Sequence, residues 1–170
     1  MGQGVSVKCS KCEYGSEYIQ GVGMMYSPDA VFFGRCDDPT QNWSVAFPDG
    51  YCEDDKPILD SLVKSKRIKE AAFELLSKGG KPGDYGHELY CCPKCHRLLN
   101  RFYFEVITPT EKYEPAYRCS RCKTALVVID PEEKEGGCKL YDRKGNEVEW
   151  QRPECKDGQL ELGGICCYGY

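Results

Sequence analysis

Cysteines spaced for metal binding are the residues of this sequence with the clearest chemical meaning. Three Cys-x-x-Cys segments, called knuckles below, pair Cys9 with Cys12, Cys92 with Cys95, and Cys119 with Cys122. Such a turn places two thiolates on one side of a tight loop, and two facing turns supply the tetrahedral four-sulfur shell that zinc prefers. The second and third knuckles, separated by 23 residues, predict one such site.

A second site needs partners for Cys9 and Cys12. The segment Pro153-Glu154-Cys155-Lys156-Asp157-Gly158 resembles a knuckle in which Arg152 replaces the first cysteine, so we expect Cys155 to be the third ligand. The fourth ligand stays open among the remaining C-terminal cysteines, and we assign Cys138 to it provisionally. The alternatives are Cys166 and Cys167.

The knuckles could also pair differently. In the alternative, Cys9 and Cys12 join Cys92 and Cys95, and the other site consists of Cys119, Cys122 and Cys155. Local pairing is favoured because closing a loop of 23 residues costs less entropy than closing one of 79, by about 1 kcal/mol. The remaining cysteines are expected to be small buried apolar residues rather than ligands. They are Cys36, Cys52 and Cys91.

The composition also points to metal. Leu, Ile, Val and Phe make up only 33 of 170 residues, so apolar burial alone gives a thin core. Structural zinc contributes on the order of 10 kcal/mol to a small domain, which compares with its whole net stability. No apolar run resembles a signal peptide or a membrane span, so we expect a cytoplasmic protein whose thiols stay reduced. The 13 cysteines therefore predict about two bound Zn²⁺ ions rather than a disulfide framework.

Strands and one helical segment are expected to position the knuckles. Apolar residues recur at helical spacing over about 57–78, with a register slip at 64–67 that indicates a bend or two shorter helices. Residues 24–55 are rich in Gly, Pro and Asp and predict short strands and loops. Alternating patterns and turn residues predict further strands and one hairpin. The strands are 14–19, 102–107, 113–118, 125–129 and 159–162, and the hairpin joins 140–141 to 148–150.

Together with a resemblance of residues 90–130 to the zinc-ribbon superfamily, these elements predict an α+β protein of small antiparallel zinc ribbons with an inserted helical segment. The expected units are an N-terminal knuckle and strand at 1–26, the insertion at 27–86, a zinc ribbon at 87–130, and a hairpin with the incomplete knuckle at 131–170.

Residues 90–130 resemble the zinc-ribbon superfamily, in which knuckle, strand, turn, strand, knuckle and strand follow in that order. The knuckle Cys9-Ser10-Lys11-Cys12 and the stretch Gly21-Val22-Gly23-Met24-Met25 are similar to bacterial proteins with several such knuckles, and that resemblance implies no particular activity. Glycine usually follows the second cysteine of a ribbon knuckle because it tolerates positive φ. Here Glu13, His96 and Lys123 hold these positions.

The function that we expect is that of a zinc-stabilised scaffold or protein-interaction module. Nucleic-acid binding is the first alternative, but the net charge of −4 would become about −8 with two four-thiolate zinc sites. The best basic cluster, Lys64, Lys66, Arg67 and Lys69, is expected to be a solvated helix face.

Thiol-based metal handling, which vicinal Cys166 and Cys167 could perform, is the second alternative. An enzyme is not expected, because the two histidines, His87 and His96, lie in no metalloprotease pattern and no phosphate-binding loop occurs.

Overall fold

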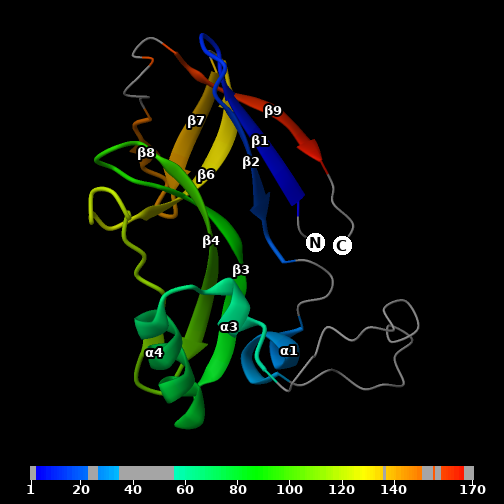
Figure 1. Ribbon diagram of the computed structural model, residues 1–170, viewed down its shortest axis with the longest axis vertical. Coiled ribbons are helices and arrows are strands. Elements are labelled where there is room, and N and C mark those ends of the chain that lie inside the picture. Colours follow the sequence, from blue (N-terminus) through cyan, green and yellow to red (C-terminus); the bar gives the residue numbers. More distant parts are fainter. Residues whose placement is uncertain are drawn as a thin grey trace, which may run out of the picture.

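Two antiparallel sheets and a few short helices make up the described part of the chain (Figure 1). The computed structural model describes residues 3–22, 27–34, 56–135, 137–150, 155 and 158–166, without the side chains of 164–166. The order of strands is β2-β1-β9 in the three-stranded sheet and β5-β4-β3-β6-β7-β8 in the six-stranded sheet. This arrangement fits the predicted α+β class.

The elements have the following bounds. The helices are α1 (Pro28–Phe33), α3 (Leu59–Leu62) and α4 (Lys66–Ser77). The strands are β1 (Gln3–Cys9), β2 (Gly15–Gln20), β3 (Lys81–Cys91), β4 (Leu98–Ile107), β5 (Lys112–Tyr113), β6 (Val127–Lys134), β7 (Gly137–Asp142), β8 (Glu147–Val148) and β9 (Leu160–Cys166).

The same three-strand unit occurs in both sheets. β1 and β2 form a hairpin, and β9 pairs antiparallel with β1. Likewise β3 and β4 form a hairpin, and β6 pairs antiparallel with β3. In each unit the hairpin loop carries one knuckle, and the third strand follows a later cysteine. We call β1, β2 and β9 the first ribbon unit, and β3, β4 and β6 the second ribbon unit.

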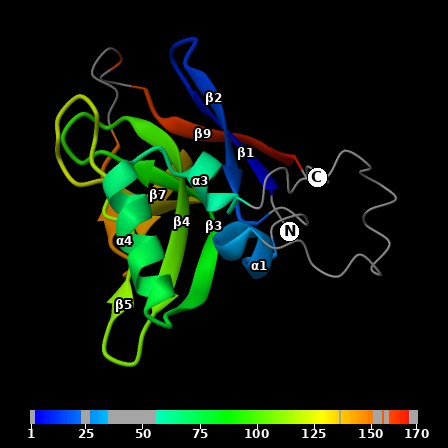
Figure 2. The ribbon, with the colours of Figure 1, turned by 60° about the horizontal axis from the view of Figure 1, so that its bottom comes forward.

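The helices pack on one face of β3 and β4 (Figure 2). Ile68, Ala72 and Leu76 recur every four residues on α4 and are buried, because this spacing keeps them on one side of the helix. They share a core with Phe102 and Phe104 of β4. None of the helices in the described part of the chain has the length and apolar character needed to cross a bilayer.

A second core joins the two sheets. Val7 of β1 and Leu160 of β9 pack with Leu89, Ile129 and Leu140 from β3, β6 and β7. Each of these side chains is at most 3% exposed. The first ribbon unit is therefore held against the larger sheet by apolar burial, and Figure 1 shows it at the end of the molecule away from α4.

The structure corrects some of the predicted elements. The segment expected at 57–78 forms two helices, α3 and α4, as the register slip indicated. The prediction of only strands and loops across 24–55 is wrong for Pro28–Phe33, which is helical. Ser27 accepts a hydrogen bond from the Ala30 N–H at the start of this helix, and Gly34 ends it with φ of 66°.

The observed strands differ from the predicted ones mainly in length. The strand predicted at 113–118 shortens to β5, and Arg118 instead forms an isolated bridge with Ala125. Pro115 interrupts this segment, and proline donates no hydrogen bond to a sheet. β1 and β3 were not among the predicted strand ranges, because several glycines and polar residues obscure their alternation.

Candidate metal centres

The first candidate centre combines the knuckles of the second ribbon unit. Cys92 and Cys95 lie in the loop between β3 and β4, and Cys119 and Cys122 lie in the turn before β6. The four Sγ atoms all lie within 4.8 Å of one another. The chain thus follows the local pairing of knuckles, and not the alternative that joins Cys9 and Cys12 to Cys92 and Cys95.

The sulfur spacing of this centre fits a metal ion. The Sγ atoms of Cys95 and Cys119 are 3.7 Å apart, across the two knuckles. Two corners of a tetrahedron with Zn–S bonds of 2.3 Å are separated by about 3.8 Å. Cys92 and Cys119 are fully buried, and Leu126 packs against the cluster. The four thiols can therefore hold one metal ion inside the protein.

Backbone hydrogen bonds prepare one of these sulfurs for metal binding. The N–H groups of Cys122 and Arg121 lower the pKa of the Cys119 thiol to about 6, because they stabilise its thiolate. Burial raises the pKa of Cys92 and of Cys95. Thiolates are the form that binds metal, so these N–H groups favour the metal-binding form of Cys119.

The three intact knuckles share one backbone hydrogen bond. In each, the N–H of the first cysteine donates to the carbonyl of the residue five positions later. The donor–acceptor distances are 2.9 Å for Cys9 to Tyr14, 3.0 Å for Cys92 to Arg97 and 2.8 Å for Cys119 to Thr124. This bond closes the loop around the two cysteines and keeps their side chains on the same side.

The residue after the second cysteine adopts the left-handed conformation in two of the knuckles. φ is 52° at His96 and 58° at Lys123, although neither is glycine, and Glu13 in the remaining knuckle does not adopt positive φ. The backbone that ribbons usually build with glycine is therefore present at the first centre, at the steric cost of a side chain in this region.

The second candidate centre lies at the tip of the first ribbon unit. Cys9 is the last residue of β1, Cys12 lies in the β1–β2 loop, and Cys155 precedes β9. Their three Sγ atoms lie within 4.8 Å of one another. Those of Cys9 and Cys155 are 3.8 Å apart, again the separation expected at a zinc ion. Unlike the first centre, this one has only three thiols from the described residues.

Gly158 borders the second centre, and the sequence analysis assigned it no role. A Cβ atom added at Gly158 would overlap the Cys9 Sγ and lie 2.8 Å from the Cys155 Sγ. Absence of a side chain at this position lets two sulfurs approach the backbone. The position of Gly158 in the knuckle-like segment, three residues after Cys155, could have indicated this role from the sequence alone.

The structure places neither Cys138 nor the backbone of Cys166 beside the second centre. The Sγ of Cys138 lies 3.7 Å from the carbonyl of Lys139 on β7, outside the sulfur cluster. In the β1–β9 register Cys9 lies opposite Leu160 and Cys166 opposite Gly4, so roughly 17 Å of strand separates the two cysteines. Cys36, Cys52 and Cys167 lie outside the described residues, and Cys91 is buried as predicted.

Neither histidine belongs to a sulfur cluster. The Nδ1 of His96 donates to the carbonyl of Glu149 at 3.0 Å and so ties the loop of the second knuckle to the segment that leads toward Cys155. His87 packs edge-on against Phe102, and burial lowers its pKa. No described cysteine forms a disulfide among the nine whose side chains are placed.

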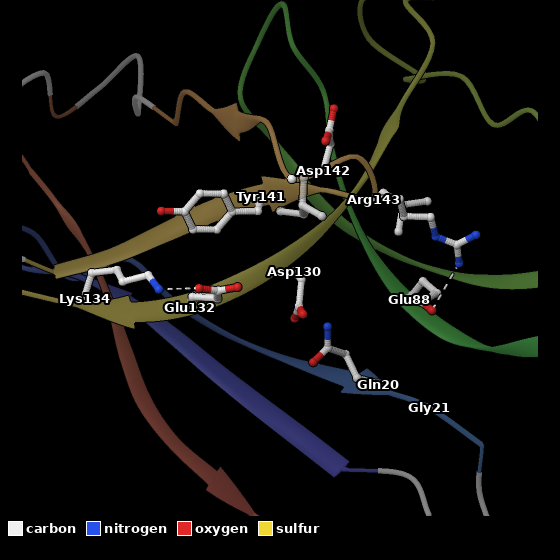
Figure 3. A pocket seen from close by; sticks show the side chains of 12 residues that line it. Gln20, Gly21, Glu88, Asp130, Glu132, Lys134, Tyr141, Asp142 and Arg143 are labelled. Atoms are coloured by element: carbon white, nitrogen blue, oxygen red, sulfur yellow. Dashed lines mark hydrogen bonds and ion pairs between the residues drawn. The ribbon is translucent and has the colours of Figure 1, made fainter.

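An open cavity of ≈ 760 Å³ lies between the two sheets (Figure 3). Its basic residues bond to acidic neighbours: Arg143 lies 3.4 Å from Glu88, and Lys134 lies 2.6 Å from Glu132. Arg143 also stacks on the Tyr103 ring at 3.7 Å. These pairs engage two of the four carboxylates on the wall, and the lining contains no cysteine or histidine.

Comparison with known proteins gives no relative from which a role could be transferred. None of the protein-family models, curated proteins and solved structures that we compared with the chain matches it. The class of protein is therefore defined by its own features: an α+β chain with two cysteine clusters that could bind metal.

Proposed function

We propose that this protein is a zinc-binding structural protein that acts without catalysis as a scaffold or protein-interaction module. The main observation in support of this proposal is the pair of cysteine clusters at corresponding places in the two ribbon units. Their measured Sγ–Sγ separations are 3.7 and 3.8 Å. In each unit the ion would join the hairpin loop to the segment before the third strand. Metal binding would thereby stabilise the loops that lack an apolar core.

Two features support a structural role for the metal. The first centre has four thiolate ligands, and a closed four-sulfur shell leaves no position for a substrate, as is typical of structural zinc. Histidine and carboxylate ligands, which catalytic zinc commonly uses, do not occur in either cluster of described residues. The cavity between the two sheets has no cysteine of either cluster in its lining.

A protein partner is favoured over a nucleic acid by charge. The net charge is −4 before metal binding, and thiolate–zinc sites make it more negative. On α4, Lys66 lies 3.6 Å from Glu70, and Lys69 bonds to Asp60, so part of the basic cluster pairs with local carboxylates. A phosphate backbone would have to displace these pairs.

The central test is the zinc content of the protein, purified with a non-thiol reductant and without chelators. We expect about two zinc ions per chain by elemental analysis. Less than one zinc per chain would overturn the proposal. Cys119→Ser should remove one ion and Cys155→Ser the other, whereas Cys138→Ser, with its side chain outside both clusters, should remove neither.

The choice of partner class has its own test. We expect no binding of DNA or RNA whose affinity falls steeply with salt, and we expect proteins from the native cell to be retained by immobilised zinc-loaded chain but not by the Cys119→Ser variant. Submicromolar, salt-sensitive binding of a nucleic acid would instead support the alternative function.

A further inference from the structure

The two candidate centres differ in the number of sulfur atoms available to a metal ion. Four thiols converge at the first centre, but only Cys9, Cys12 and Cys155 converge at the second among the described residues. Zinc in protein sites is almost always four-coordinate when its role is structural. Within the part of the chain that the structure describes, the second centre is therefore one donor short of such a site.

Comparison of the ribbon units identifies the position of the missing cysteine. Cys122 lies five residues before Val127, the first residue of β6, and Cys155 lies five residues before Leu160, the first residue of β9. Cys155 thus corresponds to Cys122. The counterpart of Cys119 is then position 152, three residues earlier, where the sequence has arginine.

The local sequence supports the same correspondence. Arg152-Pro153-Glu154-Cys155 matches Cys92-Pro93-Lys94-Cys95 in the position of the proline and of the second cysteine, but arginine replaces the first cysteine. A guanidinium group stays protonated and does not bind zinc. On the other side of Cys155, Gly158 stands at the knuckle spacing and has no side chain to offer.

Cysteines elsewhere in the described chain do not compensate. The register of β1 and β9 keeps Cys166 away from Cys9, and Cys138 bonds within its own strand. Cys12 and Cys155 are partly exposed, in contrast to the fully buried Cys92 and Cys119. Solvent and small solutes can therefore reach the sulfur cluster of the second centre.

We propose that the second centre binds its metal through the thiolates of Cys9, Cys12 and Cys155 and takes a small exogenous thiol at the fourth position. This inference rests on the proposed zinc function and specifies the ligand class of one of its sites. A thiol suits this position because soft sulfur ligands match a metal already held by three thiolates, and because a cysteine sulfur occupies the corresponding place in the first centre. On binding, the incoming thiol releases its proton to solvent and its sulfur bonds to the metal.

The test uses the full chain loaded with Co²⁺, whose visible spectrum reports the number of sulfur ligands. The protein is prepared without thiols and titrated with 2-mercaptoethanol. We expect one of the two cobalt ions to change its spectrum toward that of a four-sulfur site, saturably and reversibly, while the other ion does not respond. Cys119→Ser, which affects only the first centre, should retain this response if the variant folds.

Arg152→Cys provides the decisive comparison. This change restores a complete Cys-x-x-Cys segment, so the second cobalt ion should show a four-sulfur spectrum before any thiol is added, and the response to 2-mercaptoethanol should be lost. Arg67→Cys is the matched control, because it adds a cysteine on the exposed surface of α4. It should leave the thiol response unchanged.

Two results would overturn the inference while leaving the proposed zinc function intact. One is a pair of four-sulfur spectra in the thiol-free wild-type chain. The other is a change in the second cobalt spectrum on replacing Cys36, Cys52 or Cys167 by serine, which would show that the chain itself supplies the fourth ligand. Binding of less than one metal ion per chain would instead reject the proposed function.

Discussion

Cys9 and Cys155 are separated by 146 positions in the sequence, yet their Sγ atoms lie 3.8 Å apart. A metal ion between them would close a loop that contains most of the chain, including the whole second ribbon unit. Such an ion would add to the hydrogen bonds and apolar contacts that hold β9, which comes from the far end of the sequence, against β1. By contrast, Cys95 and Cys119 join segments only 24 positions apart.

Loss of a ligand should therefore have different structural consequences at the two centres. Cys119→Ser should unfold the knuckles of the second ribbon unit, because the binding free energy of zinc is also folding free energy. Its melting temperature and zinc content should both fall. Cys155→Ser should release one zinc and expose β9 to proteolysis, with β3 and β4 still folded around the other centre.

Cys138→Ser is the control for both variants. Its thiol is half-buried and outside the clusters, so the substitution should cost about 1–3 kcal/mol at most, the penalty for a buried hydroxyl that finds no partner. Zinc loss from Cys138→Ser, with retention in Cys155→Ser, would reverse our assignment of the second centre.

Gly158→Ala should weaken metal binding at the second centre alone. The added methyl group would overlap the Cys9 Sγ and press on the Cys155 Sγ, so the sulfurs could not keep their spacing. Gly15→Ala, in the same ribbon unit, meets only the Val7 carbonyl at 3.9 Å and should keep both ions. Zinc release to a chelator, followed for the two variants side by side, measures the difference. Equal retention by both would contradict the role given to Gly158.

Much of the candidate site could be predicted from cysteine spacing. The Cys-x-x-Cys repeat identifies the cysteines that converge in the two clusters, and loop entropy favours the local pairing that the structure has. The fourth ligand of the second centre could not be found this way. Whether Cys138 or Cys166 reaches Cys9 depends on strand register, and a sheet places residues far apart in sequence side by side through hydrogen bonds that leave little trace in composition.

The fold was predictable where the side-chain pattern was strong. The spacing of Ile68, Ala72 and Leu76 gave the main helix, and alternation around Phe102 and Phe104 gave β4. The helix at Pro28–Phe33 was missed because it is too short for periodicity to show. Its capping residues, Ser27 and Gly34, carried the signal instead.

Lys123→Gly should stabilise the zinc-loaded protein by about 0.5–1 kcal/mol. Lys123 holds φ of 58°, a conformation that costs a residue with a Cβ about 1–2 kcal/mol, part of which glycine loses again through its greater freedom in the unfolded chain. Glu13→Gly is the matched control at the same knuckle position. Because Glu13 does not adopt positive φ, glycine there should destabilise the protein. Urea unfolding at fixed zinc concentration compares the two changes, and stabilisation by Glu13→Gly alone would contradict the strain argument.

The free energy of unfolding should fall as pH rises above about 9. Burial raises the pKa of Cys91 to about 12 and that of Cys138 to about 11, and it also raises the pKa of Tyr90 and Tyr117. In the unfolded chain these groups ionise near 8.5 for cysteine and about 10 for tyrosine, so the unfolded state loses protons first and gains stability as pH increases. Each such proton contributes a slope of at most about 1.4 kcal/mol per pH unit.

Urea unfolding between pH 8 and 11 should show this decline, and Cys138→Ser should make it shallower because serine does not ionise in this range. A slope that Cys138→Ser leaves unchanged would show that this thiol does not resist ionisation in the folded protein.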